Sequence, residues 1–113
     1  MQQITTITDQ ANQLMTLVLD NGETALFRIY YLPRQQNWFF DIIYKEIAIN
    51  SIKVVLTPNA LRQFKKQIPF GIAFVTEGSV EPFNIFDFST QRIKMFVLNS
   101  EEVQRIEQEV YNI

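Results

Sequence analysis

Apolar and polar residues alternate with a period of two along several short segments of the chain, which predicts β-strands separated by polar turns. The first two strands are predicted at Leu14–Leu19 and Thr24–Tyr31. Asn21-Gly22 between them favours a hairpin with a type I′ turn, because both central residues of that turn need a positive φ. The fold is therefore expected to begin with a β-hairpin.

The next predicted strand, Trp38–Tyr44, carries a single acid among large apolar side chains. Side chains alternate between the two faces of a strand. One face then consists of Trp38, Phe40, Ile42 and Tyr44. Phe39 and Ile43 make the other face apolar as well, so we expect the strand to pack on both sides. Asp41 is expected to be a structural acid, held by an arginine such as Arg28 or by turn amides.

In the middle of the chain, the spacing of apolar residues changes from that of a strand to that of a helix. Ile47–Leu56 is predicted as a further strand, which follows the polar turn Lys45-Glu46. Thr57 is then a suitable helix N-cap, and Pro58 suits the first helical position, where its missing N–H costs nothing. Up to Pro69 the apolar residues recur at helical spacing, at Leu61, Phe64 and Ile68. These features predict a short amphipathic helix.

Two more strands are predicted in the C-terminal half, at Gly71–Thr76 and Arg92–Leu98. A turn is expected at residues 77–79, where Gly follows a polar residue. The segment FNIFDF at Phe83–Phe88 fits neither a strand period nor a helix period, so its conformation stays open.

A second helix is predicted at the end of the chain, capped by Asn99 or Ser100, with acids that favour its positive N-terminal end. Its apolar stripe consists of Val103, Ile106 and Val110. The chain then divides into three parts: residues 1–12, a flexible or partner-ordered arm; residues 13–98, a β-rich domain; and residues 99–113, a helix that packs on this domain or on a neighbouring subunit.

The predicted fold class is mainly β, a small antiparallel β-barrel or curled sheet of five to seven strands. It includes two short α-helices, one after the fourth strand and one at the C-terminus. A length of 113 residues suits one domain. Such a domain buries only about 65% of the surface of its unfolded chain. Ten phenylalanines are more than this core needs, so a protein partner is expected to cover part of them.

Composition also limits the chemistry of the chain. Without His or Cys it lacks the commonest general base, thiol nucleophiles and most metal ligands, so no cofactor, metal or catalytic residue is expected. The one candidate carboxylate pair for glycoside hydrolysis is Asp41 with Asp87, and each is better explained as a hydrogen-bonded structural acid. An enzyme is therefore the least favoured class.

A single-stranded nucleic-acid-binding barrel is the alternative function. Arg62, Lys65 and Lys66 form a small basic face, and Arg28 could act with neighbouring tyrosines as a stacking surface. A formal net charge of -2 disfavours nucleic acid. The longest apolar runs are far shorter than the ~20 residues of a membrane span, and the polar opening lacks signal-peptide features. We expect the chain to be cytosolic and soluble when it is made.

The order of these features resembles the phage baseplate plug family, small structural proteins of contractile-tailed phages. The resemblance rests on the first hairpin followed by NWFFDIIY, LTPNALRQF, GIAFV, FNIFDF and RIKMFVL. It covers about Asn12 to Leu98 and is carried by residue type. The helix from Ser100 onward is additional to the family pattern.

The resemblance implies a structural virion protein without enzymatic activity, in the baseplate core at the hub end of the tail tube. Its partners would be other baseplate, tail-tube and hub proteins, or further copies of itself, with no membrane. The protein would be made in the cytoplasm of the bacterial host. The positions that match the family pattern, mainly as determinants of the fold, are Trp38, Asp41, Pro58, Leu61 and Phe64. Phe40, Tyr44 and the stripe of the C-terminal helix complete the set of fold and assembly candidates.

Overall fold

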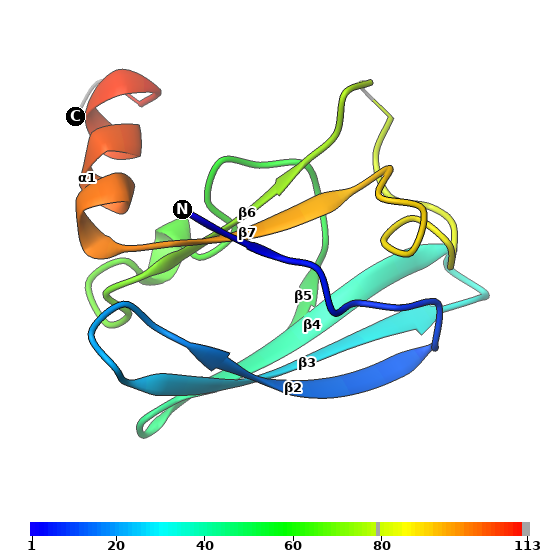
Figure 1. Ribbon diagram of the computed structural model, residues 1–113, viewed down its shortest axis with the longest axis horizontal. Helices are drawn as coiled ribbons and strands as arrows, with labels where there is room; N and C mark the ends of the chain where they lie inside the picture. Colours follow the sequence, from blue (N-terminus) through cyan, green and yellow to red (C-terminus); the bar gives the residue numbers. More distant parts are fainter. Residues whose placement is uncertain (79, 112–113) are drawn as a thin grey trace.

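The computed structural model describes residues 1–78 and 80–111 and contains two antiparallel sheets that pack face to face (Figure 1). One sheet has the strand order β1 (Gln2–Ile4), β7 (Lys94–Leu98), β6 (Gly71–Val75). The other has the order β2 (Asn12–Val18), β3 (Thr24–Leu32), β4 (Asn37–Tyr44), β5 (Ile47–Lys53). The mainly β class is confirmed. The predicted barrel is wrong, because β1 and β2 belong to different sheets and do not pair.

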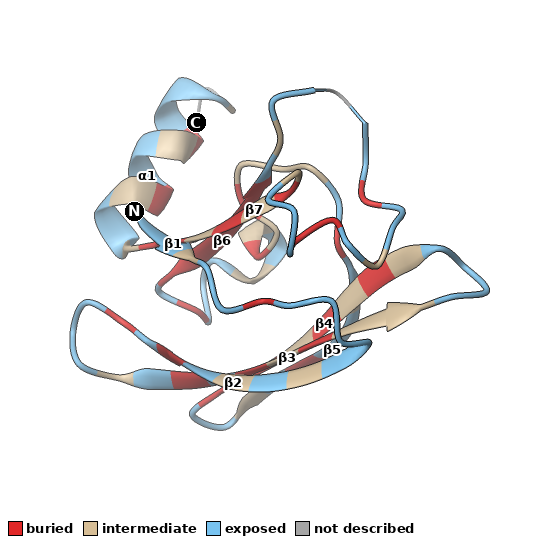
Figure 2. Ribbon diagram, turned by 45° about the vertical axis from the view of Figure 1, so that its right-hand side comes forward, coloured by how far each residue is buried: buried red, intermediate tan, exposed pale blue. Residues whose placement is uncertain are grey.

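The core lies between the two sheets, where Figure 2 shows most of the buried residues. The predicted inward face of β4 is buried throughout. Aromatic contacts join the four-stranded sheet to β6 and to the loop before β7: the ring centroids of Phe40 and Phe74 are 5.8 Å apart, and those of Trp38 and Phe88 are 5.3 Å apart. Edge and tilted contacts of this kind add to the free energy gained from apolar burial.

The opposite face of β4 is not buried, which corrects the expectation that this strand packs on both sides. Ile43 is 44% exposed, and Phe39 and Asp41 are half-buried. The helical elements lie on the side of the three-stranded sheet, so no element of the described chain covers the outside of the four-stranded sheet (Figure 1).

The predicted hairpin is confirmed as β2 and β3, but its type I′ turn is wrong. Leu19 N–H donates to Glu23 O at 2.8 Å, and Gly22 N–H donates to Leu19 O at 3.0 Å. Gly22 has φ 84°, whereas Asn21 is outside the positive region. This is a three-residue loop that ends in a left-handed glycine, which is the next most common hairpin connection. Asn21 stabilises it by accepting from Glu23 N–H.

The helix predicted after Thr57 is also wrong, since only a 3-10 turn, η1 (Arg62–Phe64), forms there. Thr57 instead pairs through both main-chain groups with Phe74 of β6. The side chain of Asn59 is buried, and its Oδ1 accepts from the N–H groups of Leu61 and Ile72 at 3.0 and 3.2 Å. These bonds to β6 hold the residues that would have formed the first helical turn.

The C-terminal helix, α1 (Ser100–Glu109), forms as predicted and packs on the outer side of the three-stranded sheet (Figures 1 and 2). Asn99 is its N-cap, in a capping box with Glu102. Val103 packs against Ala73 and Leu98. Gly71 is needed beneath it, because an added Cβ would lie 2.8 Å from Asn59 Oδ1 and 3.0 Å from Val103 Cγ2. Residues 112–113 of the predicted helical segment lie outside the described residues, as does residue 79 of the predicted turn at 77–79.

Residues 1–12, expected to form an arm, contribute to the fold of the chain itself. β1 pairs with β7, and Ile7 is buried in the core. The amino group of Met1 lies 2.6 Å from Glu102 Oε2. β1 has little signal in the sequence, because its pairing uses main-chain groups and its side chains include two glutamines.

Candidate assembly surface

The exposed side of the four-stranded sheet, which we call the outer face, carries an unusual amount of apolar side chain. Leu14 and Val18 of β2 are 66% and 60% exposed, and Leu26 of β3 and Ile43 of β4 are 40% and 44% exposed. The strand register places Leu26 directly opposite Ile43. Clustered exposed apolar residues of this kind are typical of surfaces that bind other proteins.

A polar pair divides the outer face. Arg28 Nη1 donates to Asp41 Oδ2 at 3.1 Å, on directly opposed positions of β3 and β4. Asp41 Oδ1 also accepts from the N–H of Ser51 at 2.7 Å and from the hydroxyl of Tyr30 at 3.4 Å. Asp41 is thus held by the predicted arginine. It also secures Ser51, which has φ 61°, close to the register shift between β4 and β5.

A second apolar patch lies on the loop of residues 80–92. Val80, Phe83 and Phe86 are 57%, 49% and 51% exposed. The segment FNIFDF, whose conformation the sequence left open, forms a series of turns and is neither a strand nor a helix. Two phenylalanines are therefore displayed on a loop at the end of the sandwich.

The loop is held in place by the carboxylate of one of its own residues, Asp87, which is buried and only 2% exposed. Its Oδ2 accepts from the N–H groups of Phe83 and Asn84 at 2.7 and 2.8 Å. Its Oδ1 accepts from Arg92 Nε at 2.8 Å, and Arg92 also donates to two loop carbonyls. Trp38 Nε1 donates to Asn84 O at 3.0 Å and ties the loop to the core.

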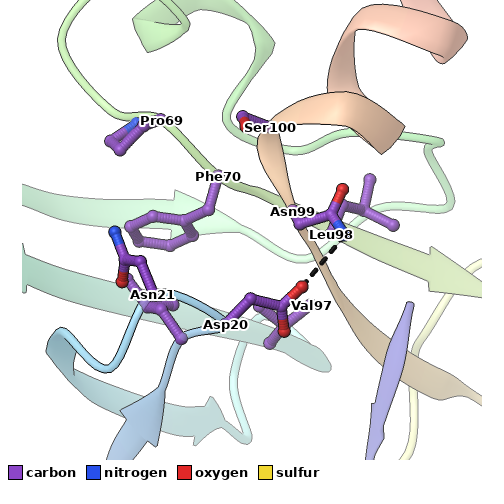
Figure 3. Close-up of a pocket in the computed structure, with 9 residues that line it drawn as sticks. Asp20, Asn21, Pro69, Phe70, Val97, Leu98, Asn99 and Ser100 are labelled. Carbon is purple, nitrogen blue, oxygen red and sulfur yellow. Dashed lines mark hydrogen bonds between the residues drawn. The ribbon is translucent and has the colours of Figure 1, made fainter.

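The structure supplies a bonding role for both members of the candidate carboxylate pair. The oxygens of Asp41 are engaged on the outer face, and those of Asp87 are engaged under the loop. A hollow between the first hairpin and the start of α1 has a volume of only about 100 Å³ (Figure 3). In it Asp20 accepts from the Asn99 side chain at 2.9 Å. This hollow is smaller than a usual ligand site, which has a volume of several hundred Å³.

The described residues also contain no cluster of acids that could hold a metal ion. Among them, none of the helices is long and apolar enough to cross a membrane.

The basic face proposed for nucleic acid is largely occupied by α1. Glu107 is buried and accepts from Arg62 at 2.9 and 3.2 Å and from Lys65 at 3.1 Å. Burial favours the neutral acid, but the hydrogen bonds from Arg62 and Lys65 outweigh it, and the pKa of Glu107 is lowered. Two of the three basic side chains thus have an internal partner.

The predicted stacking surface forms only in part, because Tyr30 lies beside Arg28 and Tyr31 does not. Tyr30 stacks on Phe39 of the outer face, with ring centroids 6.0 Å apart. Tyr31 contacts Trp38 edge to face and donates to Phe83 O at 2.9 Å. Arg28, which lies over the Tyr30 ring, is paired with Asp41.

A third polar cluster links the first hairpin to the turn between β4 and β5. Glu23 accepts from Tyr44 Oη at 2.7 Å and lies 2.8 Å from Lys45 Nζ. The hydrogen bond from Lys45, followed by that from Tyr44, lowers the pKa of Glu23 to about 2. The same bond to Glu23 raises the pKa of Tyr44. The cluster therefore joins the turn of the first hairpin to the turn between β4 and β5.

Most of the predicted candidate residues lie inside the molecule. Those in the core are Trp38, Phe40, Tyr44 and Leu61, and those at its margin are Pro58 and Phe64. In the stripe of the C-terminal helix, Val103 is buried against the three-stranded sheet, Ile106 is half-buried, and Val110 is 54% exposed.

The exposed apolar residues of the outer face and of the loop were missed. A possible sequence signal was the charge-free alternation of NQLMTLV in β2, in which every second residue faces outward.

Comparison with models of protein families gives a match over most of the chain. Residues 1–101 match the protein family described as cyanophage baseplate Pam3 plug gp18. The chain belongs to this baseplate plug family. It is therefore a structural component of a phage baseplate, in the virion tail, and its partners are other baseplate or tail proteins. A search of curated proteins gives no match.

The family match of this plug protein ends inside the first turn of α1, so most of that helix lies beyond the matched part. The two apolar surfaces, the outer face and the loop, lie within it.

Proposed function

We propose that this plug protein occupies the baseplate core, at the hub end of the tail tube, and that it acts through protein–protein contacts made by its outer face. The observation that carries the proposal is the group of exposed apolar residues on one face of β2, β3 and β4. Removing such side chains from water is the main driving force of stable association. The charges of Arg28 and Asp41 cancel each other, so this pair places polar groups on the outer face without repelling a partner.

The proposal is tested with Ile43→Lys, which places a charge in the middle of the outer face on a central strand. The variant is expected to fold with a urea midpoint close to that of the wild type, because Ile43 is already 44% exposed. Its incorporation into tail particles, measured by immunoblot of purified particles, should fall at least about tenfold, equivalent to about 1.4 kcal/mol.

Gln104→Lys is the matched control, since it adds the same charge at an exposed position of α1, away from the outer face. This variant should be incorporated like the wild type. Normal incorporation of Ile43→Lys would refute the role of the outer face. A complete, unaltered baseplate in particles that lack the protein would refute the structural role at this position.

A further inference from the structure

The two sheets have four edge strands, and three of them are protected against pairing with another chain. β1 is only three residues long. β6 is covered by main-chain bonds from Thr57 and Ala60. β5 has a register shift, a left-handed Ser51 and a terminal Lys53. Short length, bulges, charges and coverage are the usual means by which proteins protect sheet edges.

β2 has none of these protections. Its seven residues, NQLMTLV, include no charge, proline or glycine, and their register with β3 is unbroken. A long, regular and uncharged edge strand is a template for strand addition. That three edges are protected and this one is left open indicates that β2 is covered in the assembled state.

The hydrogen-bond register identifies which groups of β2 are free to pair. Leu19 N–H bonds to Glu23 O, and Tyr31 N–H bonds to Ala11 O. In an antiparallel ladder such bonded pairs alternate with non-bonded pairs. The odd-numbered residues of β2 therefore bond to β3. The N–H and C=O groups of the even-numbered residues point toward the open edge, and those after the first residue of β2 belong to Leu14, Thr16 and Val18.

A shallow groove of about 250 Å³ lies beside this edge, between β2 and β1. It is lined by residues 2–6 and 15–18, none of which is charged. A second hollow, of about 370 Å³, is lined by uncharged residues between positions 6 and 15. A strand added to β2 would direct alternate side chains toward the groove and the others toward the outer face.

We propose that the open edge of β2 accepts an extended, uncharged segment of a neighbouring baseplate protein, which adds a fifth strand to the four-stranded sheet. Main-chain hydrogen bonds supply the attachment, and small apolar or hydroxyl side chains occupy the groove. That the neighbour is a baseplate protein rests on the proposed function, whereas the availability of the edge rests on the fold alone.

A free segment fits this site better than a second copy of β2. In a paired copy, Leu17 is buried in its own core and Met15 is half-buried there, so neither is available for the groove of its partner. The grooves of both copies would stay unfilled. Apolar surface next to an unfilled space loses packing contacts.

The test measures hydrogen–deuterium exchange at single amides, for the full-length protein alone and in purified tail particles. In the free protein, Leu14, Thr16 and Val18 should exchange fast, while Met15 and Leu17, bonded to β3, are protected. In the particle the three even-numbered amides should slow by at least about tenfold, because hydrogen-bonded amides exchange only through opening. The odd-numbered amides provide the internal control.

Thr16→Pro removes one outward N–H without removing a bond to β3, and proline is tolerated at such edge positions. It should reduce incorporation into particles at least about tenfold, whereas Thr16→Ala, which keeps the N–H, should not. The Thr16 side chain lies on the outer face opposite Leu26, so Thr16→Lys keeps the backbone and places a charge beside the edge; it should also reduce incorporation. If the proline variant fails to fold, the exchange of the even-numbered amides in the particle separates pairing at the edge from contact at the outer face.

Each of three results would overturn the proposal. The first is fast exchange of the even-numbered amides in particles that contain the protein, with normal incorporation of Thr16→Lys. The second is a free protein that sediments as a dimer with these amides already protected, since a second copy would then be the occupant. The third is absence of the wild-type protein from the particle, which would refute the proposed function and with it this neighbour.

Discussion

At the scale of single residues, the plug protein uses its acids as structural anchors. Glu23 joins two turns through Tyr44 and Lys45, Asp41 joins three strands, and Asp87 holds a loop. Hydrogen bonds to a charged carboxylate are stronger than those between neutral groups. The stability of the protein should therefore depend on pH in the acid range.

Glu23→Gln tests this dependence. Because the pKa of Glu23 is about 2 in the folded protein and near 4.5 for a free acid, its charge stabilises the fold above pH 4.5. That contribution is lost as the pH falls from 4.5 to 2. The difference in unfolding free energy between the wild type and Glu23→Gln, measured with urea, should be largest at pH 6 and shrink toward pH 2.

The matched control is Glu46→Gln, which changes an exposed acid in the turn next to the same cluster. Its effect should be small at every pH. A difference for Glu23→Gln that stays constant between pH 6 and pH 2 would contradict the role of the charge.

At this scale, contacts between residues on adjacent strands could be predicted from the sequence, and contacts between more distant segments could not. The pairing of Arg28 with Asp41 could be expected, because adjacent strands of a sheet bring opposite charges together. The buried Asn59 could not, since its partners include Ile72, which is distant in the sequence. The turn at Asn21-Gly22 was placed correctly, but one further loop residue changed its type.

At the scale of elements, the loop of residues 80–92 shows how irregular backbone can be held in one conformation. The buried carboxylate of Asp87 collects two backbone N–H groups and Arg92, and the loop displays Phe83 and Phe86 above it. A rigid loop loses little conformational entropy when its apolar side chains bind a partner. The loop is therefore suited to recognition.

Asp87→Ala should destabilise the protein by about 3–5 kcal/mol, the range for removing one partner of a buried ion pair. The free energy of unfolding in urea measures this effect. Asp9→Ala, which removes an exposed acid, is the matched control and should change stability by less than about 0.5 kcal/mol. Equal stability of the two variants would mean that the loop does not depend on its carboxylate.

The strands after β1, and α1, were predictable because their signals are local. A period of two identifies strands, and Asn99 with Glu102 forms a capping box that can be read from the sequence. The region after Thr57 has an equally good helical pattern, yet its backbone pairs with β6. Tertiary hydrogen bonds override local propensity there.

At the scale of the whole molecule, the two sides of the sandwich differ. α1 lies on the three-stranded sheet and pairs its Glu107 with basic residues, while the outer face on the opposite side carries exposed apolar residues (Figure 1). The family could be inferred from the order of the elements. The layered arrangement could not, because sequence patterns do not specify which strands share a sheet.

Single-stranded DNA should not bind this protein specifically, because Arg62 and Lys65 are paired with Glu107 and the net charge is negative. In a gel-shift assay we expect no salt-dependent complex at micromolar protein. Glu107→Gln, which frees both basic side chains, is the informative comparison. A wild-type complex that weakens steeply with added salt would revive the nucleic-acid alternative.

The position of Trp38 provides a natural optical reporter. This lone indole of the sequence is fully buried between the sheets and bonded to the loop at Asn84. Its fluorescence emission should be that of an apolar site and should shift to longer wavelength when the sheets separate. Substitutions on the solvent side of β2, β3 and β4 lie on the other side of that sheet and should leave the spectrum unchanged. Folding and particle assembly can therefore be followed separately, without attaching a dye.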